Sequence, residues 1–214
     1  MSGGGKPMPE LARTRTASRS AFLDLRDEQR LVNDGYEFLD EKRILLAAEL
    51  LRQRDAWREA NAAFALRWGE AVKALPAAAA DQGLEGLLVH PRYTLEAARL
   101  EVTERPYVGQ VMLQAGMEIG ETGLSREPAR PSPEVRRCAE AFRALLEAAA
   151  PLAAITANLE RLMREYRRTE RRVRALENVV LPEIRQDLAA MEEHLDLNEQ
   201  EEVIRVRSLR GGVG

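Results

Sequence analysis

Few side chains in this 214-residue sequence have the types and spacing that catalysis or metal binding requires. The candidates are the two histidines, His90 and His194, and the only cysteine, Cys138. Imidazole and thiolate groups bind zinc, but a zinc site needs three or four ligands close together, whereas the two histidines are 104 positions apart. We therefore expect His90 to be a solvated loop residue, His194 to lie on a surface and Cys138 to be a buried apolar side chain.

The sequence also lacks the usual motifs of nucleotide-binding proteins. Gly3-Gly4-Gly5 precedes no segment with the pattern of a strand or helix that could build a phosphate-binding loop. The sequence contains no G-x-S-x-G element and no Cys/His cluster. It therefore predicts no catalytic residue, no cofactor-binding residue, no metal ligand, no cofactor and no enzymatic activity of its own. A protein of this kind is expected to work through shape, stiffness and contacts.

The composition favours helices. Charged residues make up 31% of the chain and aromatic residues only 5%, which disfavours a large aromatic-filled core. The formal net charge of −3 argues against a nucleic-acid partner, because general nucleic-acid binding needs a basic excess. No apolar run approaches the ~20 residues of a membrane span, so direct membrane insertion is not expected. A single cysteine excludes an internal disulfide and fits a reducing cytoplasm.

A long first helix is predicted over residues 18–75, after a disordered N-terminal tail of residues 1–17. Ser18 or Ser20 can cap its start, and Pro76 is expected to end it. Alternating steps of four and three residues connect thirteen positions of this helix, ten of them apolar, as in the seam of a coiled coil. These positions are Val32, Tyr36, Leu39, Arg43, Leu46, Leu50, Gln53, Trp57, Ala60, Phe64, Arg67, Ala71 and Ala74.

Residues 76–132 break this pattern and are predicted to form a small insertion. Alternating apolar residues within it predict the two short strands of a β-hairpin, at Ala98, Leu100 and Val102 and then at Val111 and Leu113. A lone hairpin is only marginally stable in water, so this one must pack on the helices or on a partner.

A second long helix is predicted over residues 133–207, followed by a flexible tail of residues 208–214. Ser132 is a good N-cap, and Pro133 suits the first helical position. The predicted fold class is therefore mainly α, a long antiparallel two-helix coiled coil with a small mixed insertion that contains the β-hairpin. Pro151 is expected to bend the second helix.

The most informative stretch is residues 171–184, Arg-Arg-Val-Arg-Ala-Leu-Glu-Asn-Val-Val-Leu-Pro-Glu-Ile. Pro182 lies inside its helical pattern and should remove a hydrogen bond and bend the helix. Successive four-residue steps from Leu176 to Leu188 should also change the supercoil locally. One side of the helix is apolar here, at Val173, Leu176, Val180 and Ile184.

This stretch resembles the signature of the D subunit, the central axle of V-type and A-type rotary ATPases, in which RRVNALE is followed by VVIP and I. Arg174 stands where that family usually has asparagine, and Leu181 replaces isoleucine. Residues 35–43 are similar to the family's G-x-x-L-L-x-x-K-R segment. Residues 18–23 are similar to the T-R-x-x-L-L that precedes it, although Ala17 stands where the family has proline.

The resemblance implies a non-catalytic rotor shaft. In that family the helical hairpin is the axle inside a hexamer of catalytic A and non-catalytic B subunits, and it couples ATP hydrolysis or synthesis to rotation and to transport of H⁺ or Na⁺ across the membrane. A small F subunit packs on its side, and a connecting subunit joins it to the membrane rotor ring. The implied location is the cytoplasmic side of the membrane, in a peripheral part of a membrane-bound complex. Periodicity alone leaves a second class open, a coiled-coil scaffold or chaperone-like adaptor without a rotary role.

The second helix carries two blocks of charge. Residues 161–174 contain seven arginines, and residues 192–202 contain six acids and no Lys or Arg. If Leu75 and Val135 are paired near the apex, the numbers of paired residues sum to about 210, and the second helix overhangs the first beyond Met191. Repulsion between its acids disfavours an isolated helix there. The overhang therefore needs a partner, either the wall of a surrounding ring or the basic residues Arg13, Arg15 and Arg19.

Overall fold

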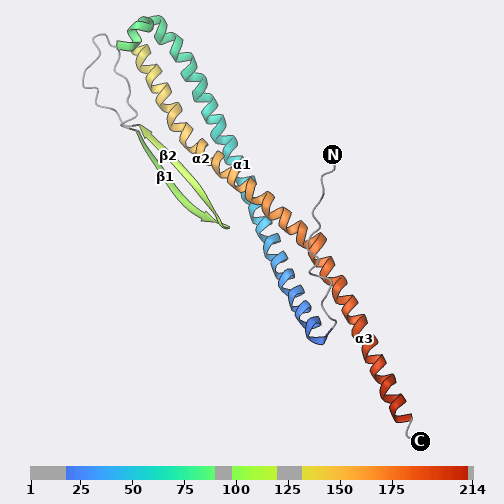
Figure 1. The fold of residues 1–214 in the computed structure, drawn as a ribbon. Helices are drawn as coiled ribbons and strands as arrows, with labels where there is room; N and C mark the ends of the chain where they lie inside the picture. The colour runs from blue at the N-terminus through green and yellow to red at the C-terminus, as the bar shows by residue number, and fades with distance from the viewer. Residues whose placement is uncertain (1–17, 90–97, 120–131, 212–214) are drawn as a thin grey trace, which may run out of the picture. The chain divides into compact units, whose positions relative to one another are not determined.

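The computed structural model describes residues 18–89, 98–119 and 132–211. The elements in chain order are helix α1 (Arg19–Val89), strands β1 (Ala98–Tyr107) and β2 (Gln110–Ile119), helix α2 (Pro133–Ala175), the π-helical turn η2 (Leu176–Val180) and helix α3 (Leu181–Gly211) (Figure 1). They form two compact units. We call Met1–Glu41 with Thr169–Gly214 the terminal unit and Lys42–Arg168 the hairpin unit. The predicted mainly α fold, with a small antiparallel two-stranded sheet between two long helical runs, is confirmed.

Helix α1 begins as predicted but continues further than predicted. The Ser18 hydroxyl accepts a hydrogen bond from the N–H of Ala21 at 3.2 Å, which satisfies an amide of the first turn. Pro76 lies inside α1, so the prediction that it ends the helix is wrong. A proline removes only one helical N–H, and the next four residues, 77–80, are all alanine, the best helix former. The chain leaves helical geometry at Gly83 instead, where φ is 69° and ψ is 163°.

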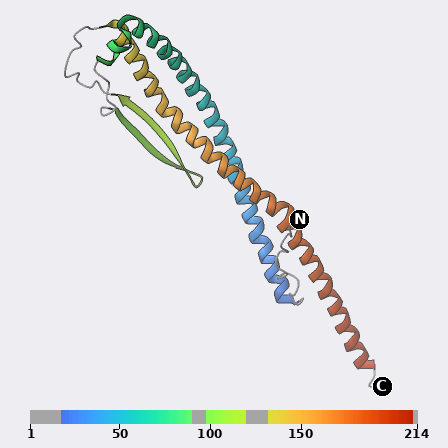
Figure 2. The same ribbon diagram turned by 45° about the horizontal axis from the view of Figure 1, so that its top comes forward.

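Within the hairpin unit, α1 and α2 run antiparallel (Figure 1 and Figure 2). Trp57 Nε1 donates to Thr156 Oγ1 at 3.2 Å, and Lys42 Nζ lies 2.6 Å from Glu165 Oε1. A higher residue number in α1 thus faces a lower one in α2. Both pairs lie within about three positions of the predicted pairing.

Helix α2 starts at the predicted cap. Ser132 Oγ accepts from the N–H of Val135 at 3.3 Å, and Pro133 occupies the first helical position. The same hydroxyl donates to Asp81 Oδ2 at 2.6 Å, which connects the start of α2 to α1. Pro151 lies inside α2 without interrupting it.

Strands β1 and β2 form the predicted hairpin. Tyr107 is opposite Gln110, and Val108 and Gly109 make the two-residue turn. Their φ angles of 47° and 77° are both positive, as a type I′ turn requires, and this turn matches the natural twist of the strands. All of β1 except its two end residues is exposed, so β2 is the strand that packs on the helices.

The hydrophobic cluster beneath the β-hairpin is small. Leu46 of α1 and Leu162 of α2 are fully buried, and Met112 of β2 packs against them. Leu50, Tyr107 and Tyr166 surround this cluster and are partly buried. Met112 and Ile119 are the two buried apolar side chains of the hairpin, so apolar burial supplies only part of its attachment.

Candidate functional site

The stretch 171–184 contains the π-helical turn η2. Here the N–H of Leu181 donates to the carbonyl of Leu176, five residues earlier instead of four. Pro182 follows directly. It has no N–H to donate, and in a regular α-helix its ring would clash with the carbonyl four residues earlier. A widened turn just before the proline relieves that clash, so the effect expected of Pro182 takes the form of a local change in helix type.

The widened turn changes which side chains are buried. Val173, Leu181 and Ile184 are 0%, 5% and 6% exposed, whereas Leu176 and Val180 are half-buried. A π turn inserts about one extra residue into the helix. Leu181 therefore takes the buried position that seven-residue spacing from Val173 assigns to Val180.

The outward side of η2 is polar and tied to the preceding turn. Asn178 Nδ2 donates to the carbonyl of Arg174 at 3.0 Å. The guanidinium of Arg174 pairs in turn with Glu170 Oε1 at 2.6 Å. Such exposed pairs contribute at most about 1 kcal/mol. This side of η2 thus presents Glu177, Asn178 and Val179, all exposed, as a surface that a partner can contact.

The apolar seam of α3 ends at Leu195. Leu188, Met191 and Leu195 are half-buried, whereas every residue of 196–208 is exposed. Arg19, the first residue of α1, forms an ion pair with Glu199. The overhang was predicted to begin beyond Met191, and this is wrong by about one helical turn. Two effects explain the difference. The long side chains of Arg19 and Glu199 meet although their backbones need not lie side by side, and η2 inserts about one extra residue into the second helical run. We call residues 196–208 the α3 overhang.

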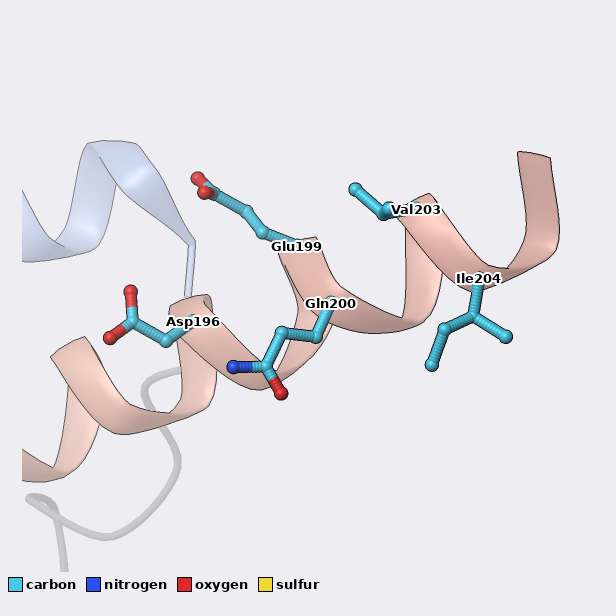
Figure 3. Close-up of a pocket in the computed structure, with 5 residues that line it drawn as sticks. All are labelled: Asp196, Glu199, Gln200, Val203 and Ile204. Carbon is cyan, nitrogen blue, oxygen red and sulfur yellow. The ribbon is translucent and has the colours of Figure 1, made fainter. Parts of the chain in front are cut away.

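An open pocket lies on the α3 overhang (Figure 3). Its apolar part consists of Val203 and Ile204, which are 51% and 65% exposed. Its polar part consists of Asp196, Glu199 and Gln200. Large aliphatic side chains this exposed gain free energy when a partner covers them. The neighbouring carboxylates favour a partner with basic groups beside its apolar ones.

In the hairpin unit, a side-chain amide attaches the hairpin to α2. Asn158 is 2% exposed. Its Oδ1 accepts from the N–H of Leu113 at 2.8 Å, and its Nδ2 donates to the carbonyl of Leu113 at 2.7 Å. Arg161 Nη1 donates to the carbonyl of Val111 at 3.2 Å. Main-chain groups on the outer edge of β2 are thus paired by side chains of α2, as a neighbouring strand would pair them.

The turn of the hairpin is held over α1. The Tyr107 hydroxyl donates to the carbonyl of Leu45 at 3.2 Å. The half-buried Lys42–Glu165 pair lies beneath the turn, since a Cβ on Gly109 would come within 3.8 Å of Lys42 Nζ. Partial burial screens this pair from salt and strengthens it relative to surface pairs.

Glu49 is the buried carboxylate of this unit. Burial by itself would raise its pKa, but hydrogen bonds from Arg52 Nε at 2.8 Å and Gln53 Nε2 at 2.9 Å outweigh burial. The charges of Arg52 and Arg105 act in the same direction, and together they hold the pKa of Glu49 below its ordinary value. A carboxylate kept ionised in this way suits a structural role better than that of a general acid.

The family model that describes the D subunit of ATP synthase matches residues 21–211. The chain belongs to this family. It is 25% identical over 193 residues to the V-type ATP synthase D subunit of Thermotoga neapolitana, a match that covers 90% of this chain and 95% of the relative. The A-type ATP synthase D subunit of Pyrococcus furiosus is 29% identical over 211 residues, with 95% and 96% covered. The V-type ATP synthase D subunit of Anaeromyxobacter dehalogenans is 29% identical over 201 residues, with 90% and 94% covered.

In this member of the D-subunit family, the residues with chemically useful side chains lie apart. Cys138 is buried as predicted, and burial raises the pKa of its thiol and so lowers its reactivity. His194 is exposed on α3, as predicted, and His90 lies outside the described residues. In the described part of the chain, no group of three or more His, Cys, Asp or Glu side chains could hold a metal ion. No helix among the same residues is long and apolar enough to cross a membrane.

Sequence reasoning missed several buried residues of this family member, among them Asn158 and Leu181. A signal for Asn158 did exist, because Ala154, Asn158 and Leu162 are spaced by four and all three are buried. A polar residue in such a series predicts a buried hydrogen-bonding partner. Leu181 became buried only because η2 shifts the helix by about one residue.

Proposed function

We propose that this chain is the non-catalytic central-stalk subunit of a V/A-type ATP synthase. It would couple ATP hydrolysis or synthesis in a hexamer of A and B subunits to rotation and to ion transport. The observation that carries the proposal is the extent of the family match, since residues 21–211 include both helical runs, the hairpin and η2. Relatives of nearly the same length are named as D subunits of V-type or A-type ATP synthases.

The α3 overhang is the part of the terminal unit that we assign to the ring. Val203, Ile204 and Val206 are at least half exposed there, and burying aliphatic groups against a ring wall would stabilise the complex by about 25 cal/mol per Å² of apolar area. Charge changes along this helix, since the acids lie within residues 196–202 and Arg205 and Arg207 follow them. A shaft with such an uneven surface presents a different face to each of three surrounding sites, which is the property that rotary coupling needs.

The hairpin unit is assigned to the subunits that turn with the shaft. The hairpin is held by specific contacts, the Asn158 amide and the Tyr107 hydroxyl, so it forms a fixed projection. A fixed projection can transmit torque to the small F subunit or to the connecting subunit. These contacts also favour a rigid subunit over a client-binding adaptor, whose surfaces are usually adaptable.

Reconstitution with purified A and B subunits tests the proposal. The isolated chain should hydrolyse no ATP, and adding it to the A/B hexamer should change the steady-state ATPase rate. The Val203→Asp/Ile204→Asp variant should bind the hexamer at least about tenfold more weakly, corresponding to about 1.4 kcal/mol. Its melting temperature should be unchanged, because both side chains are exposed.

The matched control is Glu201→Gln, a change at an exposed residue that does not line the pocket. It should bind the hexamer like the wild-type chain. ATP hydrolysis by the pure chain would contradict the proposal. So would a hexamer that neither binds the chain nor changes its rate, and binding of unfolded clients would then favour the adaptor alternative.

Hydrogen exchange gives an independent test. In the free chain, amides of residues 192–207 should exchange faster than those of 155–185, because the seam ends at Leu195. Addition of the A/B hexamer should slow exchange in 192–207 specifically. If these residues are already as protected as 155–185 without the hexamer, the assignment of the overhang to the ring is wrong.

A further inference from the structure

The start of α1 already shows what kind of group the α3 overhang attracts. The guanidinium of Arg19 forms an ion pair and hydrogen bond with Glu199, one of the pocket residues. This contact, with the nearby charge of Glu202, raises the pKa of Arg19. Figure 3 shows the first turns of α1 beside the side of α3 that carries Glu199. A basic residue from the N-terminal end of the chain thus lies at the edge of the pocket.

The chain that precedes Arg19 has the complementary chemistry. Residues 1–17 contain Lys6, Arg13 and Arg15 against the single acid Glu10. Residues 192–202 of the facing helix contain six acids and neither Lys nor Arg. The segment also contains the aliphatic Leu11, which matches the exposed aliphatic part of the pocket in size and polarity.

The tether length is also right. Ser18 caps α1, and the side chain of the next residue, Arg19, reaches Glu199 of the pocket. Residues 1–17 are therefore joined to α1 at a point within side-chain reach of the pocket. Leu11 is seven residues before Ser18, and seven extended residues span up to ~23 Å. Glu199 and Val203 are four residues apart on α3, which is only ~6 Å along the helix. The segment between Leu11 and Ser18 is therefore longer than the distance it must span. The effective concentration of Leu11 at the pocket is on the order of millimolar.

We propose that residues 1–17 dock on the α3 overhang, with Leu11 in the pocket of Val203 and Ile204 and with Arg13 and Arg15 paired with the acids of residues 192–202. The segment covers aliphatic groups that are otherwise in water. If the proposed function is correct, the segment and the ring compete for the same surface, so docking covers the Val203 and Ile204 side chains until the ring binds. That consequence rests on the proposed function, whereas the docking itself does not.

Disulfide trapping in the isolated full-length chain tests the docking. Leu11→Cys is combined with Val203→Cys in one variant and with Glu201→Cys in the other. Positions 201 and 203 are both exposed and at nearly the same height, but they lie on opposite sides of the helix, at ~200°. Under mild oxidation, the intrachain disulfide of the Leu11→Cys/Val203→Cys variant should form at least about fivefold faster than that of the Leu11→Cys/Glu201→Cys variant. Docking brings Leu11 to one side of α3, whereas an undocked segment would reach both sides equally.

Charge supplies the second measurement. Arg13→Glu with Arg15→Glu should reduce the trapping rate of the Leu11→Cys/Val203→Cys pair to that of the control pair. Raising the salt from about 0.05 to about 0.5 M should act in the same direction, because salt screens exposed charges. Cys138 is buried, and peptide mapping shows which thiols have joined. Equal trapping at 201 and 203, trapping that ignores the arginines, or disulfides mainly between two chains would each overturn the proposal.

These results do not depend on any other component of a complex. Failure of trapping leaves the ring experiments unaffected, and failure of the chain to bind the A/B hexamer leaves the trapping result unaffected. If both succeed, adding the hexamer should slow formation of the Leu11→Cys/Val203→Cys disulfide. An unchanged rate at saturating hexamer would show that the segment and the ring use different surfaces, and would contradict the competition.

Discussion

Replacing Asn158 with alanine should weaken the attachment of the hairpin to α2. The change removes two hydrogen bonds, of 2.8 and 2.7 Å, to the N–H and the carbonyl of Leu113. Each bond contributes about 0.5–1.5 kcal/mol, and a buried group left unpaired costs about 1–3 kcal/mol. Leu113 is half-buried, so water can reach part of it, which favours the lower end of this range. Alanine gains about 0.5 kcal/mol in helix propensity, which leaves a net loss of about 2–3 kcal/mol.

Urea unfolding measures this loss. Both tryptophans, Trp57 and Trp68, belong to the hairpin unit, so fluorescence reports on the unit in which the change is made. Arg161→Ala should destabilise by less than about 1 kcal/mol, because it removes one longer bond, of 3.2 Å. Asn198→Ala on the exposed overhang is the matched control and should be neutral or slightly stabilising. If Asn158→Ala unfolds within about 0.5 kcal/mol of the wild type, or if Arg161→Ala destabilises equally, the amide is not the group that holds the hairpin.

The Asn158→Asp variant separates the two bonds. At neutral pH its carboxylate can accept from the N–H of Leu113 but faces the carbonyl with a negative charge, so it should be at least as unstable as Asn158→Ala. A protonated carboxyl can also donate. Burial and the facing carbonyl raise the pKa of this carboxyl above its unfolded-state value of about 3.9. The stability of Asn158→Asp should therefore rise relative to Asn158→Ala as the pH falls through the raised folded-state pKa, and the gain should be complete below about pH 4. A difference that stays constant with pH would show that the carbonyl contact is unimportant.

Three further predictions concern the helices. Pro182→Ala should restore a regular α-helix and so remove the shift that buries position 181. A cysteine introduced at Leu181 should then be labelled faster than in the chain that keeps Pro182. An unchanged labelling rate would mean that the proline does not cause η2. Val173→Asp puts a charge at a fully buried position and should lower the melting temperature far more than Glu177→Ala on the exposed side, and equal melting would contradict the assigned seam. The depressed pKa of Glu49 contributes stability that is present above the unfolded-state pKa of about 4.3 and is lost as the pH falls through the lower folded-state pKa. Glu49→Gln should therefore flatten the pH dependence of urea unfolding below about pH 5, and curves parallel to those of the wild type would contradict this role.

Features that depend on neighbouring residues in the chain could be predicted. The Ser132 cap, the two strands of the hairpin and the spacing of the α1 seam depend on local sequence, and the structure confirms each of them. The apolar residues that predicted the strands are not the buried ones, because Leu100, Val102 and Val111 are exposed whereas Met112 and Ile119 are buried. Pro76 was predicted wrongly because the effect of a proline depends on the helix propensity of the next residues, here a run of alanines. The Asn158–Leu113 contact joins residues 45 positions apart. A local sequence pattern does not predict which strand a polar residue of a helix will contact. The Asn158–Leu113 contact could therefore not be predicted from the sequence.

The π turn shows how much of a long-range feature a sequence can contain. Steps of four residues advance ~40° past a full turn in an α-helix, so the apolar series Leu176, Val180, Ile184 and Leu188 would drift by ~120° around a regular helix. A turn that closes over five residues holds the rotation back by about one residue, or ~100°. The four-residue steps and Pro182 are therefore two signs of the same feature, η2, which returns the apolar series to the buried side. The sequence predicts that the helix is irregular near Pro182. Which side chain becomes buried depends on where the extra residue is inserted, and the burial of Leu181 agrees with an insertion within Leu176–Val180.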